Sequence, residues 1–442
     1  MSIKINIPED VNLILKTLQN NGYEAYIVGG CVRDSILNRS VNDWDITTSA
    51  RPEEIIKLFE KIIPTGLQHG TVTVMINDEG YEVTTFRKDG EYEDSRHPSK
   101  VEYVTSILLD LSRRDFTINS MAYNDAVGLV DPFEGIKDLK NKLIRCVGRA
   151  KDRFSEDALR MLRALRFSAQ LDFDIDFEIT EASKELHESL NKISVERIRE
   201  EFNKILISNS EKLEIGYVFK LTECWVSELN GLEEFSQDNP NHVYSLFDHT
   251  LKSTKLVENT LHLKLTMLLH DLGKVNTKTI DDAGIAHYYG HPNESAKIAE
   301  KILKRLKYDN DTIEKVLTLV KYHDSELRSR KSVKKMLNRI GEELLRDLIK
   351  VKWADILSQN LVYAKDRLTN LVNVEQKLNE ILEAKECFCI KDLAINGSDL
   401  INLGVKPGKE IGVLLNILLD KVIEDNSLNN KEFLIEIYKK II

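Results

Sequence analysis

The stretch from Tyr23 to Gly30, with the sequence YEAYIVGG, is the feature that most constrains the fold. Its apolar run predicts a buried strand, and the two glycines predict a tight turn into a short helix that begins near Cys31. Further along, Asp43 and Asp45 are separated by a single tryptophan. Residues two apart on an extended segment point the same way, so both carboxylates can bind a shared pair of divalent metal ions. This combination predicts a site for phosphoryl or nucleotidyl transfer.

Three further residues fit such a site. Glycines such as Gly30 let backbone N–H groups approach a triphosphate, and Arg33 can neutralise part of its charge. Glu82 completes a carboxylate triad if its strand lies beside the aspartates, so that one carboxylate bridges metal ions and another activates the attacking hydroxyl. The alternative is an ordinary strand-to-helix turn with a solvated acidic pair and an exposed strand glutamate.

The 442 residues exceed one ordinary core and predict about three modules. Residues 8–21 have helical spacing, and strand-like runs follow at 23–28, 71–76 and 81–86, the last two flanking a hairpin turn at 77–80. Beyond residue 140 the pattern is almost wholly helical. The sequence therefore predicts an α/β head followed by an all-helical remainder.

Charge is unevenly distributed along the chain. The net charge of −10 argues against nucleic-acid binding by the whole surface. Residues 137–166, however, hold ten Lys or Arg against four acids, and residues 328–350 hold eight against three. These patches predict contact with a phosphate backbone, although solvated helix faces are the alternative.

Targeting and redox signals are absent from the sequence. No run approaches the ~18 apolar residues of a membrane span, and the first residues lack a signal-peptide pattern. We therefore expect a cytoplasmic protein without a membrane partner. The five cysteines have no metal-ligand spacing, which predicts reduced, structural thiols.

Two segments near residue 100 are rich in charge. Residues 84–98, TTFRKDGEYEDSRHP, have almost no aliphatic side chains, which predicts a mobile loop near the site. In residues 111–123, Arg113 and Arg114 precede an apolar segment that is expected to be helical. Both arginines can reach phosphate groups.

Residues 156–166 are predicted to form one amphipathic helix with an ordered charged half. A carboxylate and a guanidinium one turn apart can pair with the edge of a base, and further arginines can hold phosphates. The alternative is a row of i,i+3 ion pairs worth a few tenths of a kcal/mol. The charged half comprises Glu156, Asp157, Arg160, Arg163 and Arg166.

The motifs GGCVRD, DWD, TTFRKDGEYEDSRHP, RRDFTIN, RCVGRAKDRFSEDALRMLRALRF and SVERIREEFNKIL follow one another along the chain. In this order they resemble the bacterial class II tRNA nucleotidyltransferases, the CCA-adding enzymes, with their poly(A) polymerase relatives. The resemblance implies a polymerase-β-like palm in which Asp43 and Asp45 bind Mg²⁺. It also implies that Gly30 and Arg33 touch the incoming nucleotide, and that Arg113 or Arg114 binds triphosphate.

By the same resemblance, Asp157 and Arg160 select CTP and then ATP as a protein template, assisted by Arg163 and Arg166. The implied function is template-independent addition of CCA to the tRNA 3′ end. One rigid pair of side chains cannot pair with both bases, so residues 86–98 are our candidate for repositioning it. In the family that the chain resembles, a shortened loop goes with enzymes that add only C, so the full length of this loop implies complete CCA addition or addition of the terminal A alone. An A-only enzyme and a poly(A) polymerase therefore stay open as alternatives.

Most of the histidines lie between residues 242 and 323, in strings such as LLHDLGK and KYHD. Their spacing resembles the HD-family phosphohydrolases, and imidazoles with carboxylates suit a transition metal. This resemblance implies a phosphatase or phosphodiesterase on damaged or cyclic-phosphate tRNA ends; packed histidines without metal are the alternative. We leave His242, His262 and His287 as structural. The expected ligands are His249, His270, Asp271, His291 and Asp324.

A metal-dependent HD phosphohydrolase with an RNA-binding front half is the alternative of another class. The fold class predicted from all these features is multidomain α+β, with a mixed-sheet head followed by helical neck, body and tail. The expected domains are residues 1–140, the nucleotidyltransferase head; 141–205, the neck; 206–350, the HD-type body; and 351–442, a tRNA-binding tail.

Overall fold

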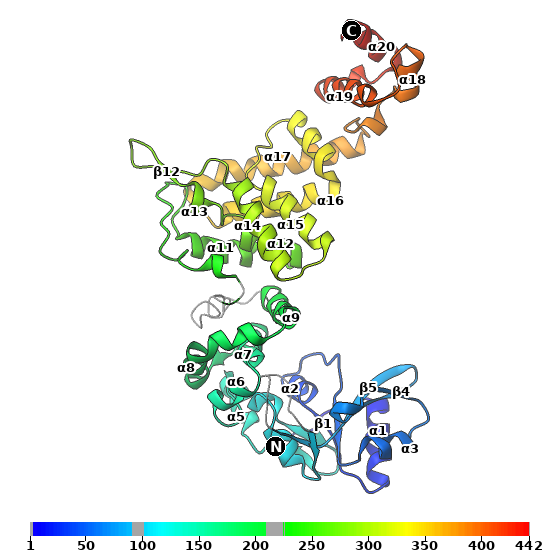
Figure 1. Ribbon diagram of the computed structural model, residues 1–442, viewed down its shortest axis with the longest axis vertical. Helices are drawn as coiled ribbons and strands as arrows, with labels where there is room; N and C mark the ends of the chain where they lie inside the picture. Colours follow the sequence, from blue (N-terminus) through cyan, green and yellow to red (C-terminus); the bar gives the residue numbers. More distant parts are fainter. Residues whose placement is uncertain (1–2, 91–100, 209–223, 225, 442) are drawn as a thin grey trace. The chain divides into compact units, whose positions relative to one another are not determined.

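The computed structural model describes residues 3–90, 101–208, 224 and 226–441 (Figure 1). The chain divides into two compact units, residues 1–227 and residues 228–442, called here the N-terminal and the C-terminal unit. The predicted multidomain α+β class is confirmed, whereas the three boundaries between the four predicted domains stay a prediction. None of the described helices is both long and apolar enough to cross a membrane.

A seven-stranded mixed sheet forms the centre of the N-terminal unit, in the order β3-β4-β5-β2-β1-β8-β9. The pair β2–β5 is parallel, and the other pairs are antiparallel. Helices α1 and α3 pack on the sheet through β1 and β4 (Figure 1). The strands are β1 Ala25–Val28, β2 Ile46–Thr48, β3 Ile62–Gly66, β4 Thr71–Ile76, β5 Glu79–Thr85, β8 Ala122–Asn124 and β9 Gly128–Val130. The helices of this part are α1 Glu9–Asn20, α2 Gly30–Ile36, α3 Pro52–Leu58, α4 Ile107–Ser112 and α5 Gly135–Asn141.

The local predictions for this sheet hold with two adjustments. The hairpin turn contains only Asn77 and Asp78, both with positive φ, because Glu79 and Gly80 already pair with β4. The apolar segment after Arg114 forms a short 3-10 helix, η2 Thr117–Asn119, in place of the predicted helix. A small pair, β6 Arg87–Asp89 with β7 Val101–Tyr103, flanks residues 91–100. The predicted mobile loop lies largely outside the described residues.

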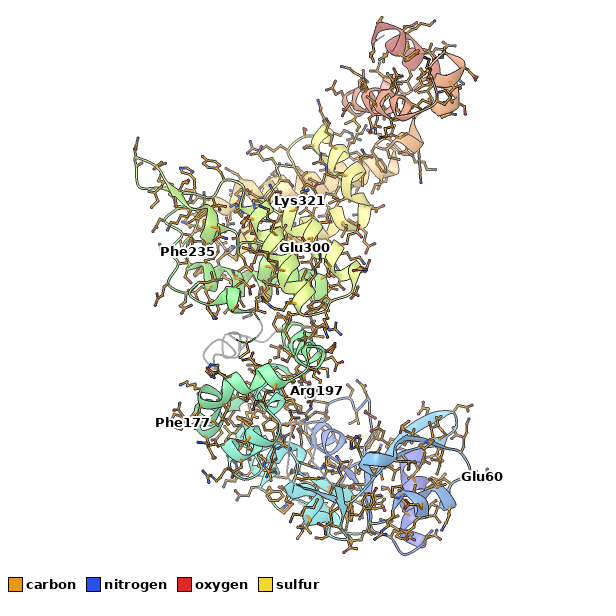
Figure 2. The ribbon with its side chains drawn as sticks, viewed as in Figure 1. Glu60, Phe177, Arg197, Phe235, Glu300 and Lys321 are labelled. Atoms are coloured by element: carbon orange, nitrogen blue, oxygen red, sulfur yellow. The ribbon has the colours of Figure 1, made fainter. Side chains whose placement is uncertain are left out.

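The helical part of the N-terminal unit differs from the prediction at one point. The expected helix over residues 156–166 is broken, because Asp157 has φ −141° and ψ 105°. Its carboxylate accepts a hydrogen bond from the backbone N–H of Leu159 at 3.0 Å and so starts a new helix. The four helices are α6 Ala150–Glu156, α7 Leu159–Leu171, α8 Phe177–Leu186 and α9 Val195–Leu206. Phe177 marks the start of α8, and Arg197 lies on α9 (Figure 2).

The C-terminal unit is a helical bundle with a short hairpin, β12 Thr279–Ile280 and β13 Ala286–His287. Its main core packs α12, α15, α16 and α17 through leucine, valine and methionine side chains. A second core joins α18, α19 and α20. The helices are α11 Leu246–Leu256, α12 Leu261–Leu269, α13 Lys274–Thr277, α14 His291–Arg305, α15 Asn310–Tyr322, α16 Arg330–Leu357, α17 Ala364–Glu383, α18 Gly397–Asn402, α19 Lys409–Glu424 and α20 Lys431–Ile441.

Candidate functional site

The glycine turn between β1 and α2 brings the predicted residues of the head together. Gly29 adopts φ 82° and ψ −127°, a conformation that only glycine takes without strain. The backbone N–H of Val28 donates to the carbonyl oxygen of Asp45 at 3.0 Å, and the N–H of Gly29 donates to that of Met121 at 3.1 Å. These bonds fix the acidic segment beside the start of α2.

A cavity of about 500 Å³ lies at this turn, and we call it the head cavity. Seven predicted site residues line it, whereas Glu82, Arg113, Asp157 and Arg160 do not. The seven are Gly30, Arg33, Asp43, Asp45, Arg114, Arg163 and Arg166.

Asp43 and Asp45 form an acidic pair in the head cavity, and Glu82 lies close to Asp45. Burial, the charge of Asp43 and, more weakly, that of Glu82 raise the pKa of Asp45 to about 6, although Arg114 opposes them. Ile46 pairs with Val83 across the parallel strands, so Asp45 and Glu82 precede paired residues. Since Ile46 and Val83 are both buried, the two acids point to the opposite face. Crowded carboxylates of this kind suit a divalent cation, so the residues fit Mg²⁺.

Two arginines approach the acids from other elements. Arg33 is buried and donates to the Asn119 side-chain oxygen at 2.6 Å and to Asp34 at 2.7 Å. Arg114 pairs with Asp110 at 3.3 Å, and one of its terminal nitrogens lies close to Gly29. Both guanidinium groups are therefore held in place at the cavity wall.

The arginines of α7 are each paired with an acid, and two of these acids come from distant segments. Arg160 bonds to Glu156 at 2.5 Å, one turn earlier. Arg163 bonds to Asp115 at 2.6 Å, and Arg166 bonds to Glu201 of α9, also at 2.6 Å. The predicted row of ion pairs within one helix is thus only partly present.

Phe167 is a residue of the head cavity that our reading of the sequence missed. Its ring is buried and lies beneath three guanidinium groups, with centroid distances of 5.1 Å to Arg33, 5.6 Å to Arg163 and 4.0 Å to Arg166. The sequence shows that Phe167 follows Arg166 directly, but a single aromatic residue in an apolar stripe normally predicts core packing.

Asp157 and Arg160 lie close to the head cavity without lining it. Asp157 accepts a hydrogen bond from Arg197 of α9 at 2.9 Å. Arg160 also donates to the carbonyl oxygens of Arg153 at 3.1 Å and Arg113 at 3.2 Å. Both proposed base-selecting groups are engaged with protein partners in this structure.

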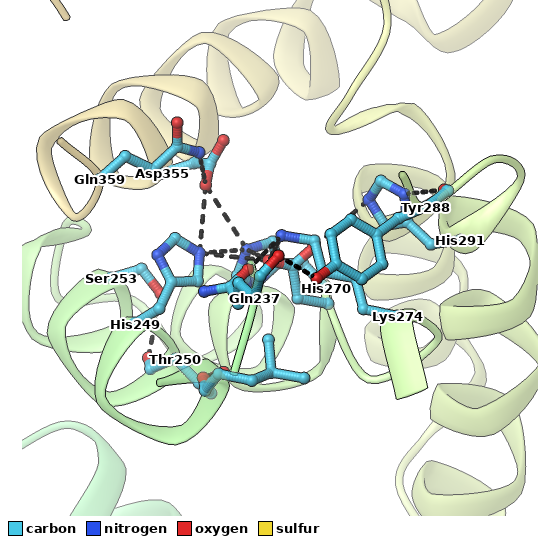
Figure 3. A network of polar contacts seen from close by, with 12 residues as sticks. Gln237, His249, Thr250, Ser253, His270, Lys274, Tyr288, His291, Asp355 and Gln359 are labelled. Atoms are coloured by element: carbon cyan, nitrogen blue, oxygen red, sulfur yellow. Dashed lines mark hydrogen bonds and ion pairs between the residues drawn. The ribbon is translucent and has the colours of Figure 1, made fainter. Parts of the chain in front are cut away.

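The C-terminal unit contains a buried cluster of imidazoles and carboxylates around Asp271. Figure 3 shows its members His249, His270 and Asp355. One Asp271 carboxylate oxygen lies 3.2 Å from Nε2 of both His249 and His270, and Asp355 lies 3.3 Å from the same His249 nitrogen. The other oxygen lies 3.3 Å from His291 Nε2 and 3.5 Å from His323 Nε2. Asp271 therefore faces two groups of candidate ligands.

The orientation of the rings fits metal binding. Nδ1 of His270, His291 and His323 each lies 2.7 or 2.8 Å from a backbone carbonyl oxygen, so each Nδ1 carries the proton and Nε2 presents a lone pair to the cluster. His291 and His323 bring these two nitrogens within 3.1 Å of each other. Burial opposes a charge on His270, but Asp271 and Asp355 raise its pKa to about 10, so a cation has to displace a proton from Nε2 to use its lone pair. An environment that favours a positive charge so strongly also suits a transition-metal cation.

The candidate groups in the structure differ from the predicted ligand set at one position. Asp324 is exposed and lies outside the candidate groups, whereas His323 belongs to one of them. His323 Nε2 lies 3.5 Å from Asp271, whereas Asp324 lines the neighbouring cavity without joining either group. Asp355, on α16, is an additional member that the histidine strings gave no signal for.

Of the three histidines expected to be structural, one lies away from the cluster. His262 pairs with Asp347 at 2.7 Å. His242 and His287 line a cavity of about 420 Å³ together with Asp271, His291, His323 and Asp355, and we call it the metal cavity. Nδ1 of His242 is buried and has no hydrogen-bond partner among the described residues.

Comparisons with known proteins agree with the geometry of the head. Residues 25–145 match the family model of the poly A polymerase head domain, and residues 172–212 match that of a probable RNA and SrmB-binding site of polymerase A. Residues 285–438 match a putative tRNA nucleotidyltransferase domain 2.

Relatives resemble the chain over almost its whole length. The CCA-adding enzyme of Ligilactobacillus salivarius is 36% identical, with 99% of this chain and 98% of that protein aligned. That of Enterococcus faecalis is 35% identical, over 97% and 94%. The crystal structure of the Bacillus stearothermophilus CCA-adding enzyme in complex with CTP is 26% identical and has a TM-score of 0.73, with 97% of each chain covered. The chain therefore belongs to the family of CCA-adding enzymes, which are tRNA nucleotidyltransferases.

Proposed function

We propose that this protein adds CCA to the 3′ end of tRNA from CTP and ATP, and that the head cavity is the site of transfer. The observation that carries the proposal is the grouping of Asp43, Asp45, Arg33 and Arg114 around one cavity at the glycine turn. The names of the relatives favour complete CCA addition over an A-only enzyme or a poly(A) polymerase.

In this proposal Asp43 and Asp45 hold Mg²⁺, which supplies charge neutralisation and activation of the tRNA 3′-hydroxyl. Glu82 precedes the residue that pairs with Ile46, next to Asp45, and would accept the proton of that hydroxyl. Arg33 and Arg114 donate hydrogen bonds to the phosphates, and the backbone N–H groups at the start of α2 add to this field. These groups hold the α-phosphate in line with the attacking oxygen while pyrophosphate leaves.

Base selection in this proposal requires a change of partners. Asp157 and Arg160 now bind Arg197 and Glu156, so a cytosine or adenine edge must displace one or both contacts. Arg160→Ala should therefore raise misincorporation more than it lowers the overall rate. Competition between CTP and ATP at each addition step measures this, and a uniform loss of nucleotide binding would assign Arg160 a structural role.

Incubation of the protein with tRNA lacking its 3′ end tests the transfer activity. CTP alone should give two additions, ATP alone none, and both nucleotides the full triplet. Asp45→Ala should abolish extension but leave tRNA binding intact, because the carboxylate would hold the metal ion and not the tRNA. Asp78→Ala, at a hairpin position whose side chain is 92% exposed, is the matched control. Undiminished extension by Asp45→Ala would refute the metal role.

We also propose that the metal cavity is a phosphohydrolase site with a transition metal. The observation that favours it is the two-sided ligand set around Asp271: His249 and His270, both also near Asp355, lie at one carboxylate oxygen, and His291 and His323 lie at the other.

Metal content and hydrolysis test this second function. Protein loaded with Mn²⁺, Co²⁺ or Ni²⁺ should hydrolyse a nucleoside 2′,3′-cyclic phosphate to a monophosphate, or release phosphate from a phosphomonoester. His270→Ala should lose bound metal and hydrolysis together. His262→Ala removes a histidine that lies outside the cluster and should keep both. Metal binding equal to that of the wild type in His270→Ala would contradict the assignment.

A further inference from the structure

A pair of stacked aromatic rings lies at the metal cavity. His287 and Tyr289 both line it, together with the candidate metal ligands. Their ring centroids are 5.4 Å apart, and the ring planes differ by only 5°. Both residues come from the β12–β13 hairpin and the turn that follows it, which extend from the helices of this unit (Figure 1).

In this stack the His287 ring is held by a hydrogen-bond partner, whereas the Tyr289 ring is exposed to solvent. His287 Nε2 lies 2.9 Å from an Asp281 carboxylate oxygen across the hairpin. The hairpin itself is fixed by the N–H of Ala286, which donates to the Asp238 carbonyl at 2.8 Å. Tyr289 is 79% exposed, although it stacks on His287. One face of its ring is therefore covered, and a flat group can approach the other face without rearrangement of the backbone.

Cationic groups complete the cavity. Lys274 and Arg367 line it, and Lys274 Nζ lies 2.7 Å from an Asp271 carboxylate oxygen. A bound phosphate can accept hydrogen bonds from both cations. The volume of about 420 Å³ falls in the range of small-molecule sites, which is more than a bare phosphate needs.

We infer that Tyr289, supported by His287, is a base-stacking subsite, and that the metal cavity takes a nucleotide that carries a phosphate on its ribose. The nucleotide is either free or the last residue of an RNA strand, because both offer the same base and phosphate. This inference rests on the proposed phosphohydrolase site. It adds that the base is recognised by its flat face, which predicts affinity for nucleotides with little preference among bases.

Binding of a fluorescent nucleotide tests the subsite without recourse to turnover. The probe is 2-aminopurine riboside 3′-monophosphate, whose emission is quenched when the base stacks, titrated into the full-length protein. Ribose 5-phosphate as competitor measures the contribution of sugar and phosphate alone. A short RNA that ends in the same phosphorylated nucleotide distinguishes a strand end from a free nucleotide.

Tyr289→Ala should weaken probe binding about tenfold and leave the affinity for ribose 5-phosphate unchanged. Tyr289→Phe should restore probe binding, since the ring face remains. Tyr363→Ala, an exposed tyrosine that does not line the cavity, should bind as the wild type does. If the RNA binds more tightly than the nucleotide and this binding depends on Tyr289, the site is assigned to strand ends. If the two bind equally, it is assigned to free nucleotides.

Two results would overturn the inference. Equal affinity of Tyr289→Ala and wild type for the probe would remove the stacking role, even if metal and hydrolysis are normal. Equal affinity of the wild type for probe and ribose 5-phosphate would show that the base is not bound. A protein that binds no transition metal but shows Tyr289-dependent binding would instead refute only the phosphohydrolase proposal.

Discussion

At the scale of single residues, the arginines of the head cavity depend on one aromatic ring. Phe167 lies against Arg33, Arg163 and Arg166, and each cation–π contact in a desolvated site is worth up to about 2 kcal/mol. The ring and the acids Asp115 and Glu201 together fix where the guanidinium groups point.

We therefore expect Phe167→Leu to raise the KM for nucleotides about tenfold or more, because the arginines lose a common support. Phe167→Tyr should restore the value. Phe173→Leu removes a buried phenylalanine outside the cavity and controls for lost packing. Steady-state kinetics with CTP and with ATP measure the effect. Equal KM values for the two leucine variants would assign Phe167 to the core alone.

Asp115 gives the head a defined response to acid. Burial raises the pKa of this carboxyl, but Arg163 and Arg160 outweigh it and lower the pKa from 3.8 to about 2. A lowered pKa in the folded state stabilises the protein above pH 4, and the stabilisation disappears as the pH falls from about 4 to about 2. The contribution is about 2 kcal/mol.

Asp115→Asn should accordingly lower the free energy of unfolding of the N-terminal unit at neutral pH, and the difference from wild type should shrink toward pH 2. Urea unfolding over a pH series measures this difference. Asp78→Asn is the control, because its partner Lys61 is at the surface. A difference that stays constant from pH 7 to pH 2 would show that Asp115 does not titrate in this range.

At the scale of elements, the turn between β1 and α2 decides the geometry of the head cavity. A Cβ on Gly29 would lie 3.2 Å from Arg114 Nη1 and would have to adopt φ 82°. A Cβ on Gly30, inside α2, would meet its nearest neighbour, Arg33, at an ordinary 3.7 Å. Gly29→Ala should therefore cost about 1–3 kcal/mol of stability, and Gly30→Ala clearly less. Thermal unfolding of both variants checks this order, which equal losses would contradict.

Elements that depend on local sequence patterns could be predicted, whereas features that depend on tertiary contacts could not. β1, β4, β5 and the glycine turn follow from local apolar patterns and turn residues, and the structure contains them. The break at Asp157 could not be predicted, because the residues around it have helical spacing and the aspartate starts α7 through its own side chain. Asp355 and Glu201 face partners that only the tertiary fold brings near, so the sequence did not show which residues they contact.

At the scale of the whole molecule, the two units carry chemically different sites. Oxygen ligands in the N-terminal unit suit Mg²⁺, whereas the imidazole-rich cluster of the C-terminal unit suits a softer metal. No residue is shared between the head cavity and the metal cavity, since their linings come from separate units. The two proposed activities should therefore respond independently to metal removal.

A chelator selective for transition metals, used in excess Mg²⁺, should abolish hydrolysis and leave CCA addition unchanged. Conversely, Asp45→Ala should stop nucleotide transfer while the protein still binds one or two equivalents of Mn²⁺ or Ni²⁺ in the C-terminal unit. Hydrolysis of a phosphomonoester, extension of a truncated tRNA and metal analysis of the same preparations provide the three measurements. His270→Ala is the converse variant: it should lose hydrolysis and still extend tRNA normally. Joint loss of both activities on chelation would mean that transfer also depends on the cluster around Asp271.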